Sequence, residues 1–424
     1  MSFTRNHRYP SVKKRFAIWA ALFSVGTLAM PSTALASNER ESLTTDSERY
    51  FKSEDIFNLE YVSEVQVSPN GKYVAYVRRS NDIMSDSSRA NVWLASVDGK
   101  SHRPLLSSKK SYYSIRWSPD GSRLAYLSNE EGKPQLYVRW MDTGQTALVT
   151  NVTSNPSNMT WSPDGKHIAF TMSVDAKEKP LDIKMPKKPD GAKWSPSFQY
   201  ITKARYQADG RGILEPAYTH IFIVPADGGT ARQLTSGNYH HNGRLSFSPD
   251  SDKIYFSANR SDNWEYEPVE GDIFSVDMMG NIAQLTNDKG LESSPVVSPD
   301  GKHIAYARRD DEKVMYKNSY LYVMKSDGTD AQNLTKDIDN SVSNFHWKDN
   351  KHVYFQQSVR GLAQVDVVSL SGRVKAVANG LGGTTLGRPY VFGTYHAVDD
   401  VVAYTKGRTD RPADLYVTTR NERQ

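Results

Sequence analysis

The chain has 424 residues, a formal net charge of +5 and no cysteine. Its length suffices for two average domains or one large repeat fold, and the lack of cysteine excludes a disulfide framework or a lipid attached to cysteine. The first 15 residues carry five basic residues and no acidic one, so residues 37–424 are formally neutral. A nucleic-acid-binding role therefore lacks its usual electrostatic basis.

The N-terminus has the pattern of an export signal. The basic residues are followed by an apolar run from Phe16 to Met30 and by Ala34-Leu-Ala36, which predicts a signal peptide over residues 1–36, cleaved after Ala36. The mature protein is then periplasmic or extracellular. The alternative is an N-terminal membrane anchor, for which the apolar run is short. Residues 37–57 are polar and charged, and predict a short helix or an arm lying on the fold.

A phrase of the form Trp-Ser-Pro-Asp-Gly recurs with variations along the chain. Its copies begin at Val67, Trp117, Trp161, Phe247 and Val297, with a degenerate copy at Trp347. Proline presets φ for a turn, Asp or Asn caps the turn, and Gly takes the positive φ. Because alternating apolar residues flank the turn, each copy predicts a β-hairpin.

A second pair of strands follows each hairpin and usually ends in a Leu-Thr pair, as at Leu148-Val-Thr150 and Leu334-Thr335. Seven such units, repeating every 40 to 50 residues or so, predict an all-β, seven-bladed propeller over residues 58–420. A solenoid of the same units would leave its ends exposed. The third unit is interrupted by an insertion at 175–216, and residues 421–424 form a tail.

The repeat resembles the TolB type, found in TolB propellers and in the N-terminal propellers of the prolyl oligopeptidase family of serine peptidases. Longer stretches are similar to the acylaminoacyl-peptidase and dipeptidyl-peptidase branch of that family. They are Thr219-His-Ile-Phe-Ile-Val-Pro-Ala-Asp-Gly-Gly229 with Arg232-Gln-Leu-Thr235, Pro189-Asp-Gly-Ala-Lys-Trp194 and Phe256-Ser-Ala-Asn-Arg260. The resemblance covers about Ser53 to Val417.

In that family, catalysis resides in an α/β-hydrolase domain after the propeller, with its nucleophile in a Gly-x-Ser-x-Gly turn. This motif does not occur in the 424 residues. We therefore expect the hydrolase domain to be absent, the chain to be a truncated form with no catalytic residue of its own, and peptide cleavage to need a missing or separate domain. We expect no metal and no cofactor.

The segment Trp264-Glu-Tyr-Glu267 resembles the propeller segment with which dipeptidyl peptidases hold the amino terminus of a substrate, with Pro268 where a second adjacent Glu would stand. The resemblance implies that Glu265 and Glu267 accept an ammonium group and that Tyr266 forms a wall. The alternative is a loop held together by its aromatic residues. His240-His241 could bind a metal, but a polar loop is the alternative because no Cys or carboxylate stands at ligand spacing.

These observations predict the substrate-gating propeller of an exported dipeptidyl or acylaminoacyl peptidase acting on short peptides. The insertion is then either a lid over a partner domain or a surface excursion. The alternative function is a stand-alone, periplasmic TolB-like module that binds a protein partner, because a propeller supports both roles. We expect no nucleic-acid partner and no membrane contact after the leader is cleaved.

Overall fold

The computed structural model describes residues 51–176, 186–195, 200–310, 314, 316–383 and 393–419. The predicted signal peptide, most of the predicted arm, part of the insertion and the tail lie outside these residues. The chain divides into two compact units, and the unit described below begins at Phe57. A short 3-10 helix, η1 (Ser53–Asn58), precedes the first strand. In the described part, no helix is long and apolar enough to cross a membrane.

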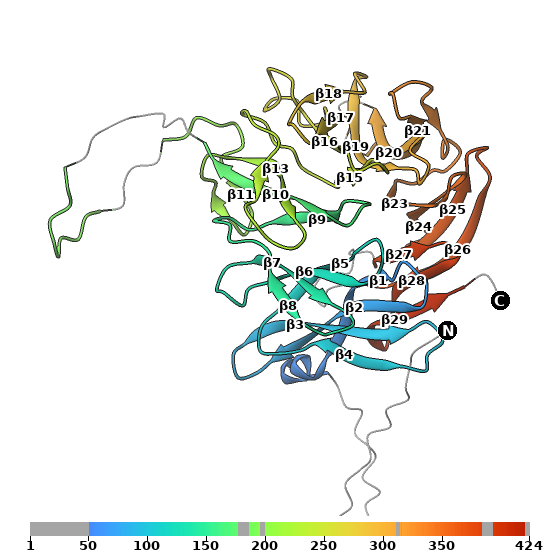
Figure 1. Ribbon diagram of the computed structural model, residues 1–424, viewed down its shortest axis with the longest axis horizontal. Helices are drawn as coiled ribbons and strands as arrows, with labels where there is room; N and C mark the ends of the chain where they lie inside the picture. Colours follow the sequence, from blue (N-terminus) through green and yellow to red (C-terminus); the bar gives the residue numbers. More distant parts are fainter. Residues whose placement is uncertain are drawn as a thin grey trace, which may run out of the picture. The chain divides into compact units, whose positions relative to one another are not determined.

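The described strands form seven antiparallel sheets arranged around a common centre (Figure 1), together with a small hairpin. Five sheets each take four consecutive strands in chain order. These sheets, which we call blades 1, 2, 4, 5 and 6, consist of β1 (Glu60–Val67), β2 (Tyr73–Asp82), β3 (Ser87–Ser96) and β4 (His102–Leu106); β5 (Tyr112–Trp117), β6 (Arg123–Ser128), β7 (Gln135–Trp140) and β8 (Thr146–Leu148); β15 (Ser246–Phe247), β16 (Lys253–Ala258), β17 (Asp272–Asp277) and β18 (Ile282–Gln284); β19 (Gly290–Val297), β20 (His303–Asp310), β21 (Tyr320–Lys325) and β22 (Gln332–Asn333); and β23 (Val342–Asp349), β24 (His352–Val359), β25 (Leu362–Ser369) and β26 (Val374–Leu381).

The other two sheets differ from this plan. Blade 3 contains β9 (Ser157–Trp161), β10 (His167–Asp175), β13 (Ala217–Pro225) and β14 (Arg232–Gln233), and the hairpin of β11 (Gln207–Ala208) and β12 (Gly212–Ile213) lies between its second and third strands in the sequence. Blade 7 has three strands among the described residues, β27 (Tyr395–Val398), β28 (Val401–Arg408) and β29 (Arg411–Thr418). The prediction of a seven-bladed propeller is confirmed.

The repeated turn has the geometry that its residues dictate. In the copy at Trp117, the Ser118 hydroxyl donates to Asp120 at 2.6 Å and accepts the N–H of Arg123 at 2.9 Å, while Gly121 has φ 71°. Hydrogen bonds from Ser118 and Ser122 lower the pKa of Asp120 to about 2. This hairpin is therefore closed by its own side chains, and glycine is favoured at the turn because a Cβ is strained at that φ; in the copy at Phe247, Ser251 takes the same position with φ 66°.

Two further residues of the repeat connect strands and blades. Thr150, Thr235, Thr286 and Thr335 each accept a backbone N–H from the third strand of their own blade, at 2.9 to 3.0 Å. The indole N–H of Trp117, Trp161 or Trp347 instead donates to a backbone carbonyl of the preceding blade, at 2.8 to 3.1 Å. The Trp that begins the repeated phrase is thus a link between neighbouring blades.

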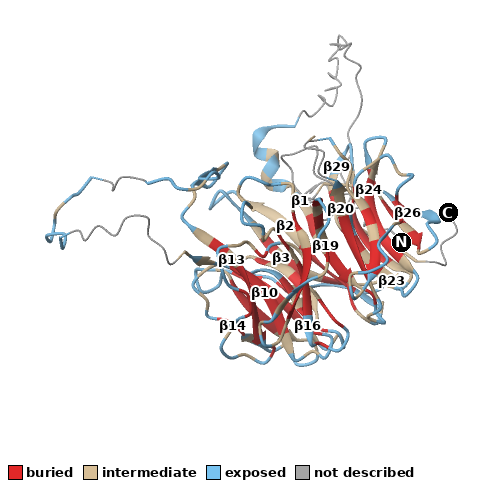
Figure 2. Cartoon of the chain, turned by 90° about the horizontal axis from the view of Figure 1, so that it is seen from above, coloured by how far each residue is buried: buried red, intermediate tan, exposed pale blue. Residues whose placement is uncertain are grey.

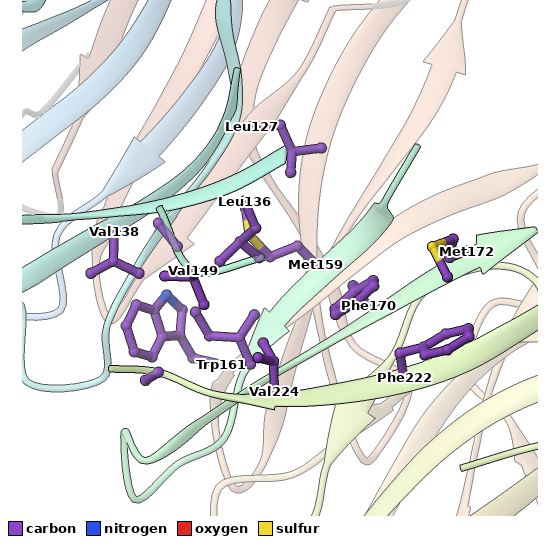
Figure 3. Close-up of a cluster of buried hydrophobic side chains, with 13 residues drawn as sticks. Leu127, Leu136, Val138, Val149, Met159, Trp161, Phe170, Met172, Phe222 and Val224 are labelled. Carbon is purple, nitrogen blue, oxygen red and sulfur yellow. The ribbon is translucent and has the colours of Figure 1, made fainter. Parts of the chain in front are cut away.

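The core lies between blades, and buried residues follow the strands while the loops are exposed (Figure 2). Between blades 2 and 3, for example, Leu136 and Val138 pack with Trp161, Phe170 and Val224 in one apolar cluster (Figure 3). Burying one such side chain contributes about 1.5 to 3 kcal/mol. Because every blade shares its apolar faces with both neighbours, the stability of each depends on closing the ring.

Closure is made by apolar packing between the first and the seventh blade. Val62, Val65 and Val67 of β1 lie in one buried cluster with Leu415 and Val417 of β29. The described strands of blade 7 all come from residues 395–418, so no strand of blade 1 joins that sheet. Among the described residues, the ring is thus held at this position by side chains, with no shared ladder of backbone hydrogen bonds.

Candidate ammonium-binding site at the Trp264 loop

The loop that carries the predicted site joins β16 to β17 in blade 4. Asn259 orders it from within, since its side-chain amide donates to the carbonyl of Glu267 at 2.9 Å and its side-chain oxygen accepts the N–H of Ser261 at 3.1 Å. The N–H of Tyr266 donates to the carbonyl of Asn263 at 2.8 Å. These bonds form a turn that holds residues 264–267 in place.

Glu265 is bound by the returning half of the insertion in blade 3. Its Oε1 lies 2.6 Å from the ammonium nitrogen of Lys203, and its Oε2 accepts the backbone N–H of Ala204 at 3.3 Å. The Glu265 side chain is 15% exposed and that of Lys203 39% exposed. The carboxylate is therefore a largely buried partner for a cation that comes from the insertion of another blade.

Aromatic rings complete the surroundings of this cation. The Lys203 ammonium lies 5.7 Å from the ring centre of Tyr218 in β13 and 5.9 Å from that of Trp264. His240 packs edge-on against Trp264, with ring centres 5.3 Å apart, and its Nδ1 accepts the N–H of Thr219 at 3.3 Å. A carboxylate and two aromatic faces are the usual elements of a site for an organic ammonium group.

A pocket of about 350 Å³ opens beside Glu265 and is lined by Ala204, Arg205, Tyr206, Gln207 and Glu265. It therefore lies between the Trp264 loop and the segment of the insertion that enters β11. A pocket of this volume has room for one or two amino-acid residues of a peptide next to the carboxylate.

Glu265 and Lys203 each stabilise the charged form of the other. Burial raises the pKa of Glu265, but hydrogen bonds from Lys203 and from the N–H of Ala204 outweigh it and hold that pKa below its usual value. The hydrogen bond to Glu265 raises the pKa of Lys203. Burial, together with the charges of Arg205 and Lys203, lowers the pKa of His240. At neutral pH the site thus consists of a carboxylate, an ammonium and an uncharged imidazole.

The structure separates the three residues that the sequence placed together. Glu265 lines the pocket, whereas Tyr266 is 76% exposed and Glu267 bonds within its own loop, through Ser261 Oγ at 3.4 Å. His240 belongs to the aromatic surroundings of Lys203. His241 is buried, lies 3.2 Å from His220 between their Nδ1 atoms, and accepts from Arg260 at Nε2. The described residues contain no cluster of three or more His, Cys, Asp or Glu arranged to hold a metal.

Sequence reasoning missed Lys203 and Tyr218, the two residues that meet Glu265 and Trp264. Both lie in or beside the insertion, some 45 to 60 positions earlier in the chain, so no local spacing relates them to the loop. The sequence feature that could have indicated this contact is the basic and aromatic run Lys203-Ala-Arg-Tyr206, whose charge is opposite to that of the acidic Trp264 loop.

Comparison with known families gives two overlapping matches. Residues 71–214 match the TolB beta propeller domain, and residues 195–310 match the N-terminal region of dipeptidyl peptidase IV. The second match includes the Trp264 loop, Lys203 and Tyr218. Each match covers about a third of the chain or less, and the two overlap over residues 195–214.

Among individual proteins, the chain is 30% identical to an uncharacterized peptidase, YuxL, of Bacillus subtilis over 49% of its own length and 31% of that protein. It is 23% identical to dipeptidyl-peptidase 5 of Porphyromonas gingivalis over 95% of its own length and 58% of that protein. An acylaminoacyl peptidase of Pyrococcus horikoshii superposes with a TM-score of 0.65 at 17% identity, over 85% of this chain and 51% of that one. The chain thus spans less than two thirds of these relatives, and what it shares with them is the propeller.

Proposed function

We propose that this propeller is the substrate-gating part of an exported serine peptidase of the dipeptidyl or acylaminoacyl type. In this role Glu265 receives the free ammonium group of a short peptide, while the ring restricts access to the nucleophile. The 424 residues hold no Gly-x-Ser-x-Gly turn, so the nucleophile, its base and the oxyanion hole are supplied by a hydrolase domain outside them. The contribution of this chain is selection and orientation of the substrate.

The observation that carries the proposal is the Lys203 ammonium at 2.6 Å from Glu265, close to the rings of Tyr218 and Trp264. This side chain stands where the α-ammonium of a substrate would bind, with the same charge and the same hydrogen-bonding capacity. The adjacent pocket offers room for the first residues of the peptide. A peptide therefore binds by displacing Lys203, whose flexible side chain is already partly exposed.

Export is part of the same proposal, because the basic and apolar leader of residues 1–36 has the form of a signal peptide. A second candidate function is a protein-binding module of the TolB kind, favoured by the match of residues 71–214 to that propeller domain. In that role the propeller would engage a folded partner, and Glu265 would only fix the insertion to blade 4.

Equilibrium binding of a matched pair of dipeptides, one with a free amino terminus and one acetylated, distinguishes these functions. We expect the free peptide to bind at least about tenfold more tightly, and Glu265→Gln to remove this difference, because a hydrogen bond between charged groups is lost. Glu267→Gln is the matched control and should retain the preference. Equal binding of the two peptides would refute the proposal and leave the protein-binding role.

A further inference from the structure

The centre of the propeller contains a cluster of basic side chains, which comes from blades that are not adjacent. Arg116 lies in β5 of blade 2, and Arg244 lies two residues before β15 of blade 4. His346 lies in β23 of blade 6, and His396 lies in β27 of blade 7. All four are partly exposed. We call this group the axial cluster.

One hydrogen bond shows that the axial cluster spans the ring. A guanidinium N–H of Arg244 donates to the carbonyl of Phe345, which joins blade 4 to blade 6 without passing through blade 5. Such a bond between blades that are not neighbours has to cross the centre of the propeller, around which the first strands of the blades are arranged (Figure 1). The ring of His346 lies 5.0 Å from that of His396 and 5.1 Å from that of Tyr395.

The charge of this cluster is not neutralised in the described part of the chain. No carboxylate there lies within ion-pair distance of Arg116 or Arg244. Glu64 is the carboxylate whose field reaches Arg116, but its two oxygens accept the backbone N–H groups of Ser114 and Ile115 at 3.0 and 3.3 Å. The Arg244 guanidinium thus lies in the electrostatic field of Arg116, and Glu64 is the carboxylate nearby.

The electrostatic consequences agree with this geometry. Burial and the charge of Arg116 lower the pKa of Arg244 to about 10, so the Arg244 guanidinium remains charged at neutral pH. Burial and the fields of both arginines lower the pKa of His346, and they lower that of His396 to about 3. The imidazoles are therefore neutral and add hydrogen-bonding capacity without adding charge.

Within the part of the chain that the structure describes, the two arginines use only some of their hydrogen-bond donors. Arg116 donates one N–H to the carbonyl of Ile115 at 2.7 Å, and Arg244 donates one to that of Phe345. A guanidinium carries five N–H donors in a fork that fits a carboxylate or a phosphate. Holding two such groups at a partly buried centre, where the charge of Arg116 acts on Arg244, costs free energy unless an anion compensates their charge.

We propose that the axial cluster is a binding site for a small oxyanion, held by Arg116 and Arg244 with His346 and His396 beside it. The ligand chemistry is that of a carboxylate or a phosphate, which is either a free anion or the C-terminal carboxylate of a peptide. This site is independent of Glu265, since none of its residues belongs to the Trp264 loop or to the insertion.

The test measures binding to the full chain with three probes: inorganic phosphate, N-acetyl-trialanine with a free C-terminal carboxylate, and the same peptide as its C-terminal amide. The acetyl group removes the ammonium that Glu265 would recognise. We expect phosphate or the free carboxylate to bind and the amide not to bind, and the probe that binds more tightly identifies the source of the anion. Absence of binding by both anions would overturn the proposal.

Variants locate the site. Arg116→Gln and Arg244→Gln should each weaken anion binding by about tenfold to a hundredfold, because each removes charge-assisted hydrogen bonds. Arg232→Gln is the matched control, as Arg232 is exposed in β14 on the fourth strand of blade 3, and it should bind like the original chain. Equal anion affinity in all three variants would place the anion elsewhere and refute the proposal.

A measurement on the original chain covers the case in which Arg244→Gln fails to fold. We expect a saturating anion to slow backbone hydrogen exchange in β5 (Tyr112–Trp117) and β23 (Val342–Asp349), the strands that carry Arg116 and His346. Slower exchange confined to other blades would contradict an axial site.

Discussion

Replacing Lys203 by methionine should make the propeller bind short peptides more tightly. In the structure the Lys203 ammonium lies 2.6 Å from Glu265, in the position that we assign to the substrate ammonium, so it competes with the peptide. Methionine keeps the length and the apolar stem of the side chain and removes its charge. The gain in affinity then equals the free energy of the contact that the peptide no longer has to break.

The size of this effect follows from the geometry. Two unit charges about 4 Å apart attract by about 4 kcal/mol at the effective dielectric of a protein surface and by about 1 kcal/mol in water. Lys203 is 39% exposed, and an exposed pair also loses side-chain entropy, so a net contribution of about 1 kcal/mol is expected. Removing it should increase peptide affinity about fivefold, since 1.4 kcal/mol corresponds to tenfold.

Isothermal titration calorimetry with a dipeptide that has a free amino terminus measures this change. Lys203→Arg is the matched control, because it keeps the competing charge and should leave affinity near that of the original chain. Lys203→Met combined with Glu265→Gln should bind no better than Glu265→Gln alone. An affinity that is unchanged or lower in Lys203→Met would refute the idea that Lys203 occupies the peptide site.

Three further predictions concern the fold. Burial raises the pKa of Glu292 to about 8 despite the opposing field of Arg308, so the folded state binds this proton more tightly than the unfolded state does. The stabilisation of the folded state by this proton is complete below the usual pKa of about 4.5 and is lost as pH rises toward 8, at up to about 1.4 kcal/mol per pH unit. In urea unfolding, Glu292→Gln should therefore be more stable than the original chain at pH 8 and not at pH 4. A lower stability of Glu292→Gln at pH 8 would contradict this. Gly328→Ala should destabilise the fold by about 1 to 2 kcal/mol because of the backbone φ of +91°, and by about 1 to 3 kcal/mol more because the new Cβ would lie 2.5 Å from the carbonyl oxygen of Leu285. Gly372→Ala, at φ +81° with open space around it, should show only the cost of the backbone conformation. Equal melting temperatures for the two variants would exclude the clash. Trp347→Phe should lower the free energy of unfolding by about 1 to 3 kcal/mol in the same urea assay, because the carbonyl of Val296 in the preceding blade loses its indole donor. An unchanged stability would show that this link between blades contributes nothing.

The repeats made the fold predictable, and the reason is local. Each Ser-Pro-Asp-Gly turn closes through bonds among residues five apart or fewer, as at Ser118, Asp120 and Arg123, so the sequence of one copy determines its hairpin. Copying the same unit around the chain then leaves a closed ring as the way to bury both faces of each sheet. The bond from each Trp to the preceding blade is also periodic, but its partner is a backbone carbonyl and leaves no mark in the sequence.

The candidate site was only half predictable. Glu265 and Trp264 stand in a segment that resembles a known motif, whereas Lys203, Tyr218 and His240 approach them through the packing of blade 3 against blade 4. The axial arginines were invisible for the same reason, since Arg116 and Arg244 occupy different positions in their repeats and meet only when the ring closes. Contacts of this kind depend on the arrangement of the blades, which residue spacing does not encode.

The position of a bound peptide's ammonium nitrogen tests the central proposal most directly. In a crystal structure of the chain with a dipeptide that has a free amino terminus, we expect this nitrogen within hydrogen-bonding distance of Glu265, beside the rings of Tyr218 and Trp264, with Lys203 displaced from the carboxylate. A peptide bound elsewhere, with the contact between Lys203 and Glu265 intact, would contradict the account.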